Sequence, residues 1–166
     1  MKFPPDLLAA RHTSPLGSIL LAATHRGLAG LWFEGQRYHP DTGKWPMEPD
    51  HPVLTVACRQ LDEYFAGERT VFDLPLDLQG GTPFQRSVWQ ALLGIPAGQR
   101  TSYAALSQRI GRPAAVRAVG AAVGRNPVSI VVPCHRVVGT DGSLTGYAGG
   151  LDRKTALLHL EQGMPR

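Results

Sequence analysis

Cysteine and lysine are both scarce in this chain of 166 residues, and each scarcity narrows what the protein can be. Its two cysteines, Cys58 and Cys134, are too few for a disulfide framework, so we expect a reducing compartment, the cytoplasm. They are also too few for a cysteine-based zinc site, and we expect no metal. Lys154 is the only lysine after residue 81, so arginine carries almost all the positive charge of the second half.

Long apolar runs are also absent from the sequence. None approaches the length of a membrane-spanning helix, and residues 1–6 lack the apolar core of a signal peptide. We therefore expect a globular protein that does not enter a membrane. Its length allows one large domain or two small ones. The pair Gly80-Gly81 marks the expected boundary, which gives an N-terminal domain over 1–79 and a C-terminal domain over 80–166.

The charge of the chain is divided unevenly between its halves. Residues 1–81 hold seven basic and ten acidic residues, whereas residues 82–166 hold ten basic and three acidic ones. An arginine-rich basic half indicates a polyanionic partner, because the guanidinium group matches the geometry of phosphate. Charge alone does not distinguish this from an ordinary soluble basic surface.

The first half has the pattern of a mixed α/β domain. Residues 18–24 and 27–33 predict two strands joined by a short turn. Apolar residues recur at helical spacing over 54–65, which predicts a helix. Residues 71–78 are consistent with either a strand or an extended connector, since they contain a proline.

The second half has the pattern of short helices. Thr82 is typical of a helix cap, and it begins a helix that ends before Gly94. Residues 102–110 predict a second helix and residues 114–123 a third. The tight turn over 111–113 makes this pair a helix-turn-helix pattern, although many such pairs bind nothing.

The segment 130–138, with the sequence IVVPCHRVV, holds the best candidate for a reactive group. Its β-branched runs favour extended, buried backbone, and Pro133 fixes a turn at Cys134. The alternative is that Cys134 is an ordinary buried cysteine. The neighbouring His135 does not settle this, because adjacent side chains on a strand point to opposite faces.

Pro133-Cys134-His135-Arg136-Val137 resembles the motif of the O6-alkylguanine-DNA alkyltransferases, also called methylated-DNA–protein-cysteine methyltransferases. Other stretches are similar to motifs of that family, in the family's order: Ser102-Tyr103, Arg117-Ala118-Val119-Gly120, Asn126-Pro127, Gly146-Tyr147-Ala148-Gly149-Gly150 and Glu161. The resemblance is dense from 82 to 161 and looser before, where 14–17 and 64–67 also match. It implies a ribonuclease H-like α/β domain, with a small antiparallel sheet plus a helix, followed by a mainly α domain with a winged helix-turn-helix.

The resemblance implies direct DNA repair. An alkyl group would pass from O6-alkylguanine in duplex DNA to Cys134, once per molecule and without a cofactor. A water, His135 and Glu161 would form a relay with the thiol. Asn126 would tie the DNA-binding turn to the cysteine segment. Tyr103 would crowd the 3′ phosphate, hydrogen-bond the flipped base and protonate the leaving guanine.

The same resemblance assigns the nucleotide contacts. Backbone groups of Val137 and Ala148 would bind the base, and Tyr147 would form a wall of its pocket. Arg117 would fill the gap left in the duplex by the flipped nucleotide. The proposed contacts with DNA are Arg117, Ala118, Gly120, Ala121 and Arg125.

The third predicted helix lacks the side chains that read base edges, since residues 114–124 display a single arginine. Its small residues allow close approach to another surface, which favours the minor groove and sequence-independent binding of double-stranded DNA. The alternative is a small-residue helix packed against a neighbour. We expect a monomer, and cooperative assembly on DNA stays open.

The sequence argues against three other functions. A cysteine hydrolase would show repeated turnover, and its usual motifs do not match this chain order. A helix-turn-helix regulator would need base-reading side chains, which 114–124 lacks. An alkyltransferase-like lesion binder would carry another residue in place of Cys134.

Overall fold

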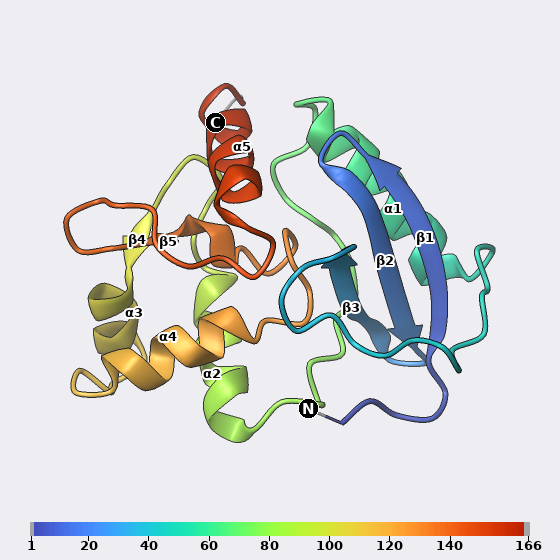
Figure 1. Cartoon of the computed structure of the whole chain (residues 1–166), viewed down its shortest axis with the longest axis horizontal. Coiled ribbons are helices and arrows are strands. Elements are labelled where there is room, and N and C mark those ends of the chain that lie inside the picture. Colours follow the sequence, from blue (N-terminus) through green and yellow to red (C-terminus); the bar gives the residue numbers. More distant parts are fainter. Residues whose placement is uncertain (1, 165–166) are drawn as a thin grey trace.

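The computed structural model of the chain describes residues 2–164 and places a sheet and a helical part side by side (Figure 1). The elements of the sheet part are β1 (Leu8–Ser14), β2 (Gly17–Thr24), β3 (Gly27–Phe33) and α1 (Pro52–Phe65). The elements of the helical part are α2 (Pro83–Leu92), β4 (Thr101–Ser102), α3 (Tyr103–Arg109), α4 (Val116–Gly124), the 3₁₀ turn η1 (Cys134–Arg136), β5 (Val137–Val138) and α5 (Leu151–Gln162).

The sheet is antiparallel, with the strands in the order β1-β2-β3. The expected strands over 18–24 and 27–33 are therefore confirmed, the first one residue longer. The sequence analysis missed β1, which pairs residue for residue with β2. Its only fully buried side chains are those of Ala9 and Ala10, and alanines at strand positions give a weak alternation signal.

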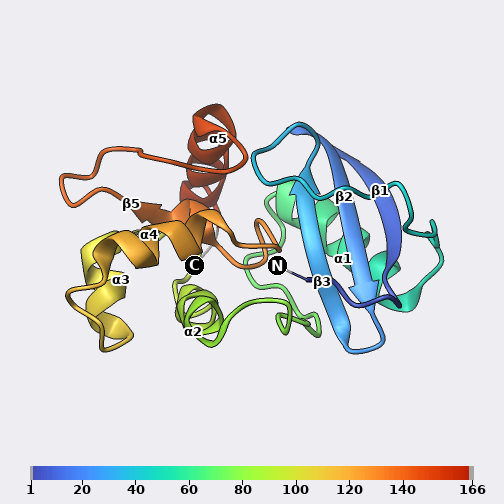
Figure 2. The same ribbon diagram turned by 60° about the horizontal axis from the view of Figure 1, so that its bottom comes forward.

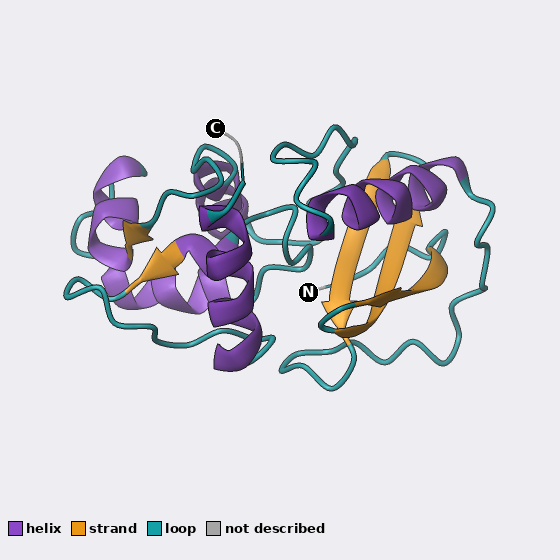
Figure 3. Cartoon of the chain, turned by 90° about the horizontal axis from the view of Figure 1, so that it is seen from above, coloured by secondary structure: helices purple, strands orange, loops and turns teal. Residues whose placement is uncertain are grey.

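Helix α1 covers one face of the sheet, as Figure 3 shows from above. The predicted helix over 54–65 is confirmed, and it begins at Pro52, a favoured first position. Its side chains Leu54, Leu61 and Tyr64 are fully buried in the main core. The opposite face of the sheet buries a second, smaller cluster around Trp32, so the sheet is covered on both sides.

The outer edge of β3 is covered by segments that come later in the chain. The amide of Leu28 donates to the carbonyl of Pro75 at 2.8 Å, which fixes residues 71–78 as an extended connector with one bridge at Leu76. Further along β3, the amide of Leu31 donates to the carbonyl of Pro127 at 2.8 Å. Both bonds pair backbone groups at the edge of β3 that would otherwise lack a partner strand. The bond to Pro127 also fixes the segment that leads to Cys134 to the sheet.

Helices α2, α3 and α4 pack against one another in the helical part. The capping box predicted at Thr82 is present, with reciprocal bonds between Thr82 and Gln85. Helix α4 begins at Val116, two residues later than expected, because Ala115 has non-helical backbone angles and closes a turn with Arg112. The helix-turn-helix of α3 and α4 is otherwise as predicted.

A small wing accompanies this helix-turn-helix. Strand β4 pairs in parallel with β5, and a long loop over 139–150 leaves β5 and extends beside α3 and α4 (Figures 1 and 2). Helix α5 then packs against η1. The winged helix-turn-helix and the small α/β domain agree with the expected fold class.

The extended backbone expected before Cys134 is wrong. Residues 129–132 form successive turns, and the amide of Val132 donates to the carbonyl of Val128 at 2.9 Å. Ile130 has a φ of 72°, a left-handed conformation that a β-branched residue rarely adopts and that cannot continue a strand. The β-branched residues are buried as predicted, but tertiary packing rather than strand pairing places them.

Candidate active site

Cys134 lies at the first position of η1, where turns on either side hold it rigidly. Only 5% of its surface is exposed. Asn126 donates from Nδ2 to its Sγ at 3.1 Å and to the carbonyl of Val132 at 2.8 Å. The Oδ1 of Asn126 accepts from the amide of Val128 at 2.9 Å. One amide side chain therefore joins the end of α4 to the cysteine turn.

The thiol of Cys134 is protonated in this environment. Burial raises the pKa of Cys134 to about 11, and the hydrogen bond from Asn126 and the nearby charge of Lys154 oppose the rise only in part. Cys134 is therefore not a preformed thiolate, and its proton has to be removed when it reacts.

His135 is fully buried and faces Glu161 rather than Cys134. Its Nε2 lies 2.8 Å from Oε2 of Glu161. Burial lowers the pKa of His135, against the opposing effect of Glu161, so the ring is neutral. Since the carboxylate accepts, Nε2 carries the proton and Nδ1 offers a lone pair. That Nδ1 is buried and has no partner among residues 2–164.

Glu161 is the centre of a buried network that the sequence analysis found only in part. Arg136 donates to it twice, at 2.8 and 2.7 Å, and Tyr64 donates from α1 at 2.7 Å. Burial alone would raise the pKa of Glu161, but the hydrogen bonds from Arg136 and His135 and the charge of Arg136 hold it well below its usual range. The sequence did contain a signal for Tyr64 and Arg136, since both lie in stretches that are similar to the family motifs.

A cavity of about 390 Å³ opens at Cys134. Five of the predicted site residues line it with Cys134, namely Tyr103, Gly120, Ala121, Tyr147 and Ala148. The other lining residues are Arg37, Tyr38, Val123, Gly124, Gly146, Gly150 and Leu151. Of the residues expected to touch the base, Val137 alone does not line this cavity.

Val137 is fully buried behind the cavity, and its carbonyl accepts a bond from Lys154 Nζ at 2.6 Å. The same ammonium donates to the carbonyl of Thr145 at 2.8 Å and to that of Gly146 at 3.2 Å. Lys154 thus ties the wing loop to β5. The sequence analysis missed this role of Lys154. The signal in the sequence was that Lys154 is the only lysine in a half whose other basic residues are arginines.

Tyr103 stands between the cavity and the wing loop. Its hydroxyl donates to the carbonyl of Thr145 at 3.2 Å, and burial raises the pKa of Tyr103. A Cβ added to Gly120 would lie 3.7 Å from the Tyr103 ring, so packing within the protein tolerates a side chain there. The glycine leaves open space between α4 and Tyr103.

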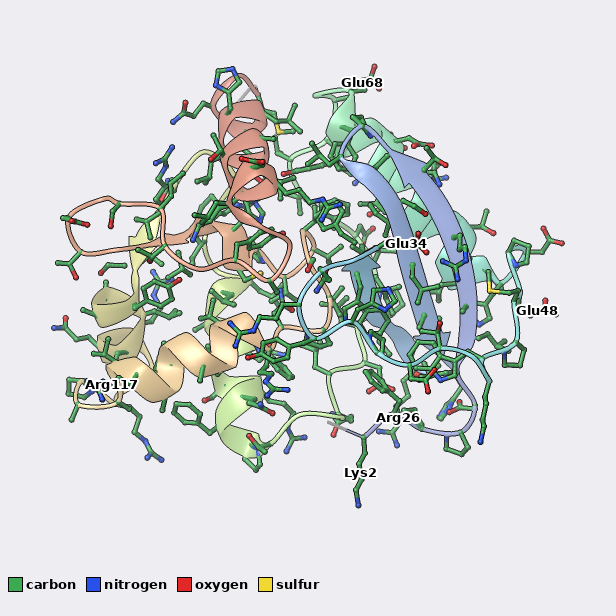
Figure 4. All side chains as sticks on the ribbon, in the orientation of Figure 1. Lys2, Arg26, Glu34, Glu48, Glu68 and Arg117 are labelled. Atoms are coloured by element: carbon green, nitrogen blue, oxygen red, sulfur yellow. The ribbon has the colours of Figure 1, made fainter. Side chains whose placement is uncertain are left out.

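Helix α4 buries one face and exposes the other. Val119, Ala122 and Val123 pack inward, and the indole of Trp89 donates to the carbonyl of Ala122 at 2.8 Å. The exposed face carries four of the five predicted DNA contacts, with Gly120 half-buried beside them: Arg117, Ala118, Ala121 and Arg125. Figure 4 shows Arg117 at the outer end of α4.

Within residues 2–164, no helix is long and apolar enough to cross a membrane. Among the same residues, no three His, Cys, Asp or Glu side chains are grouped so that they could hold a metal ion.

Comparison with known proteins gives consistent matches over nearly the whole chain. Residues 9–78 match the family described as "6-O-methylguanine DNA methyltransferase, ribonuclease-like domain", and residues 83–163 match "6-O-methylguanine DNA methyltransferase, DNA binding domain". A methylated-DNA–protein-cysteine methyltransferase of Mycobacterium bovis is 50% identical over 149 residues, which are 90% of this chain and 88% of the relative. One of Methanosarcina barkeri is 48% identical over 90% of this chain and 93% of its own length.

Solved structures agree with these matches. The crystal structure of Mycobacterium tuberculosis O6-methylguanine methyltransferase superposes with a TM-score of 0.87 at 46% identity, covering 96% of this chain and 95% of that one. A structure of Mycobacterium tuberculosis OGT in complex with DNA gives a TM-score of 0.85 at 47% identity, over 93% of this chain and 92% of that one.

Proposed function

The chain belongs to the family of methylated-DNA–protein-cysteine methyltransferases, proteins of DNA repair by alkyl transfer, and we propose that Cys134 is its alkyl acceptor. The observation that carries this assignment is the position of Cys134 in the cavity, next to a neutral histidine and an ionised glutamate. The substrate is O6-alkylguanine in double-stranded DNA of any sequence. The acceptor is used once, because a thioether is not hydrolysed and no second thiol lies at hand.

The thiol of Cys134 has to lose its proton before the sulfur can react. At a pKa of about 11, ionising Cys134 at pH 7 costs about 5 kcal/mol. His135 Nδ1 is the buried base, and a bridging water connects it to the thiol, since the two side chains do not bond directly. Glu161 stabilises the imidazolium that results, as the acid does in other triads.

The bond changes then balance without a cofactor. The sulfur of Cys134 attacks the alkyl carbon, the bond from that carbon to O6 breaks, and a carbon–sulfur bond forms. The guanine leaves with an extra electron pair and takes up one proton, for which Tyr103, which lines the cavity, is the proposed acid. The proton that His135 took from the thiol then restores the hydroxyl of Tyr103. The net reaction moves one alkyl group to sulfur and one hydrogen to guanine.

Positioning supplies most of the rate. Holding the alkyl carbon in line with the sulfur is worth about 7–11 kcal/mol, which exceeds the cost of ionisation. The turns around Cys134 and the bonds of Asn126 keep the sulfur in one place. The backbone of Ala148 and the ring of Tyr147 hold the base against it, and Val137 supports this wall from behind through Lys154.

The exposed face of α4 is the DNA contact. The O6 atom lies inside the base stack, so the nucleotide has to flip out at a cost of a few kcal/mol. Arg117 occupies the gap, while Ala118, Gly120 and Ala121 allow the backbone of α4 to approach the minor groove. Arg125 contacts phosphate. The protein acts as a monomer in the cytoplasm, where its two free thiols stay reduced.

Intact mass spectrometry after mixing with one equivalent of O6-methylguanine duplex tests the assignment. We expect a gain of one methylene unit, mapped to Cys134 and saturating at one per chain. The variant Cys134→Ala should bind the duplex without gaining mass. Repeated turnover would favour a hydrolase, and tight binding without mass gain would favour a lesion sensor. Methyl transfer by Cys134→Ala would overturn the role of Cys134.

A further inference from the structure

The N-terminal half contributes two residues to the cavity at Cys134, Arg37 and Tyr38. They lie in the loop after β3, which Figure 1 shows running toward the helical part. The amide of Arg37 donates to the carbonyl of Ala148 at 2.9 Å, so this loop is attached to the wing loop. All the other lining residues belong to 103–151, the region that contacts the nucleotide in the proposed function.

Tyr38 is held in place by two arginines. The guanidinium carbon of Arg125 lies 3.8 Å from the centre of its ring, and that of Arg37 lies 4.8 Å away. Each such contact is attractive, by about 0.5–1 kcal/mol at an exposed site. The backbone of Tyr38 has a φ of 62°, in the left-handed region that tyrosine seldom adopts. A residue kept in an unfavourable conformation by its surroundings often has a function there.

The ring of Tyr38 also borders a second cavity. This space of about 290 Å³ is lined by Phe3, Trp32, Gln36, Tyr38, His39, Pro40, Arg125, Asn126 and Pro127. Its walls combine three aromatic rings and two prolines with the polar side chains of Gln36, His39, Arg125 and Asn126. Tyr38 is the residue common to this cavity and the one at Cys134, so its side chain stands between them.

We propose that Tyr38 determines which alkyl groups the site accepts, because its ring closes the Cys134 cavity against the second cavity behind it. This inference rests on the proposed function, in which residues of 103–151 hold the base. Arg37 and Tyr38 are the lining residues that remain, and we infer that they face the alkyl group. A methyl group fits without any change. A benzyl group needs more space, and once the ring is removed the second cavity supplies it, with Phe3, Trp32 and two prolines available to contact the benzyl ring.

Substitution of Tyr38 tests this directly. Tyr38→Gly and Tyr38→Asn remove the ring, and both residues tolerate the left-handed backbone at this position. Tyr38→Phe keeps the ring and is the matched control. The rate constants for transfer to Cys134 are measured by intact mass, from duplexes carrying O6-benzylguanine or O6-methylguanine. Thermal melting checks that each variant is folded.

The ratio of benzyl to methyl transfer is the readout. We expect it to rise about tenfold in Tyr38→Gly and Tyr38→Asn, the discrimination that a small change in an apolar pocket gives. It should stay within about twofold of wild type in Tyr38→Phe. An unchanged ratio in both ring-free variants, when folded, would overturn the role of Tyr38. A wild-type protein that accepts neither alkyl group would instead overturn the proposed function itself.

Discussion

Tyr64 of α1 donates a buried hydrogen bond of 2.7 Å to Glu161 of α5, a residue 97 positions later in the chain. The same carboxylate accepts from His135 and Arg136. Glu161 therefore orients the histidine of the proposed relay and joins the two halves of the chain. Stability and chemistry depend on one side chain here.

Tyr64→Phe removes this link while leaving the ring in the core. A hydrogen bond to a charged group contributes about 1.5–3 kcal/mol, so we expect the free energy of unfolding to fall by that amount. Urea denaturation measures it. Alkyl transfer from free O6-benzylguanine should change little, because Arg136 still holds Glu161. Tyr38→Phe, at a residue whose hydroxyl makes no hydrogen bond to another of residues 2–164, should leave stability unchanged. An equal loss in both variants would contradict the prediction.

Glu161→Gln should reduce both stability and its dependence on pH. Removing the charge leaves the buried Arg136 unpaired, which typically costs about 3–5 kcal/mol. Because the pKa of Glu161 is lowered in the folded state, its contribution is complete above the unfolded value of about 4.3 and is lost as pH falls toward the folded value. The difference between wild type and variant should therefore shrink as the pH is lowered below about 5.

Denaturation of both proteins from pH 7 to pH 3 measures this difference. A gap between the two that stays constant across the range would show that the pKa of Glu161 is the same in the folded and the unfolded chain, which would contradict the prediction. Transfer by Glu161→Gln should be slowed at every pH, since the imidazolium of His135 loses its partner.

Asn126→Asp changes the partner of the thiol with almost no change in shape. The carboxylate cannot donate to Cys134 Sγ or to the carbonyl of Val132, and its charge opposes a thiolate. We expect transfer from free O6-benzylguanine to slow about tenfold or more at pH 7, with the rise in rate displaced to higher pH. A pH–rate profile checks both. An unchanged profile in a folded variant would mean that Asn126 does not act on the sulfur.

Arg117→Ala should separate nucleotide flipping from chemistry. The side chain is exposed on α4 and does not line the Cys134 cavity, so we expect transfer from free O6-benzylguanine to be unaffected. Transfer from duplex DNA should slow about tenfold or more, because the flipped state loses the group that fills the gap. Arg109→Ala, an exposed arginine of α3, loses the same charge and is the control. Equal slowing in both variants would indicate general electrostatics only.

Local sequence patterns were enough to predict helices α1 to α4 and the two strands β2 and β3. The capping box at Thr82, the apolar spacing over 54–65 and the turn over 111–113 depend on neighbours within a few residues, so the sequence was sufficient for them. The same holds for Cys134 as the candidate nucleophile and for α4 as a helix without base-reading side chains. The family motifs indicated Glu161, Asn126 and Tyr103 as site residues from the sequence alone.

Long-range packing decided the rest. Strand β1 was missed because its buried side chains are alanines, and the segment before Cys134 was expected to be extended because β-branched residues favour strands. Its turns are fixed instead by the edge of β3, a partner far away in the sequence. The sequence likewise determined that Cys134 is a thiol near a histidine. Only the tertiary structure, through burial and through the hydrogen bonds around Glu161, decided that the thiol is protonated and that His135 is neutral, as the proposed base has to be.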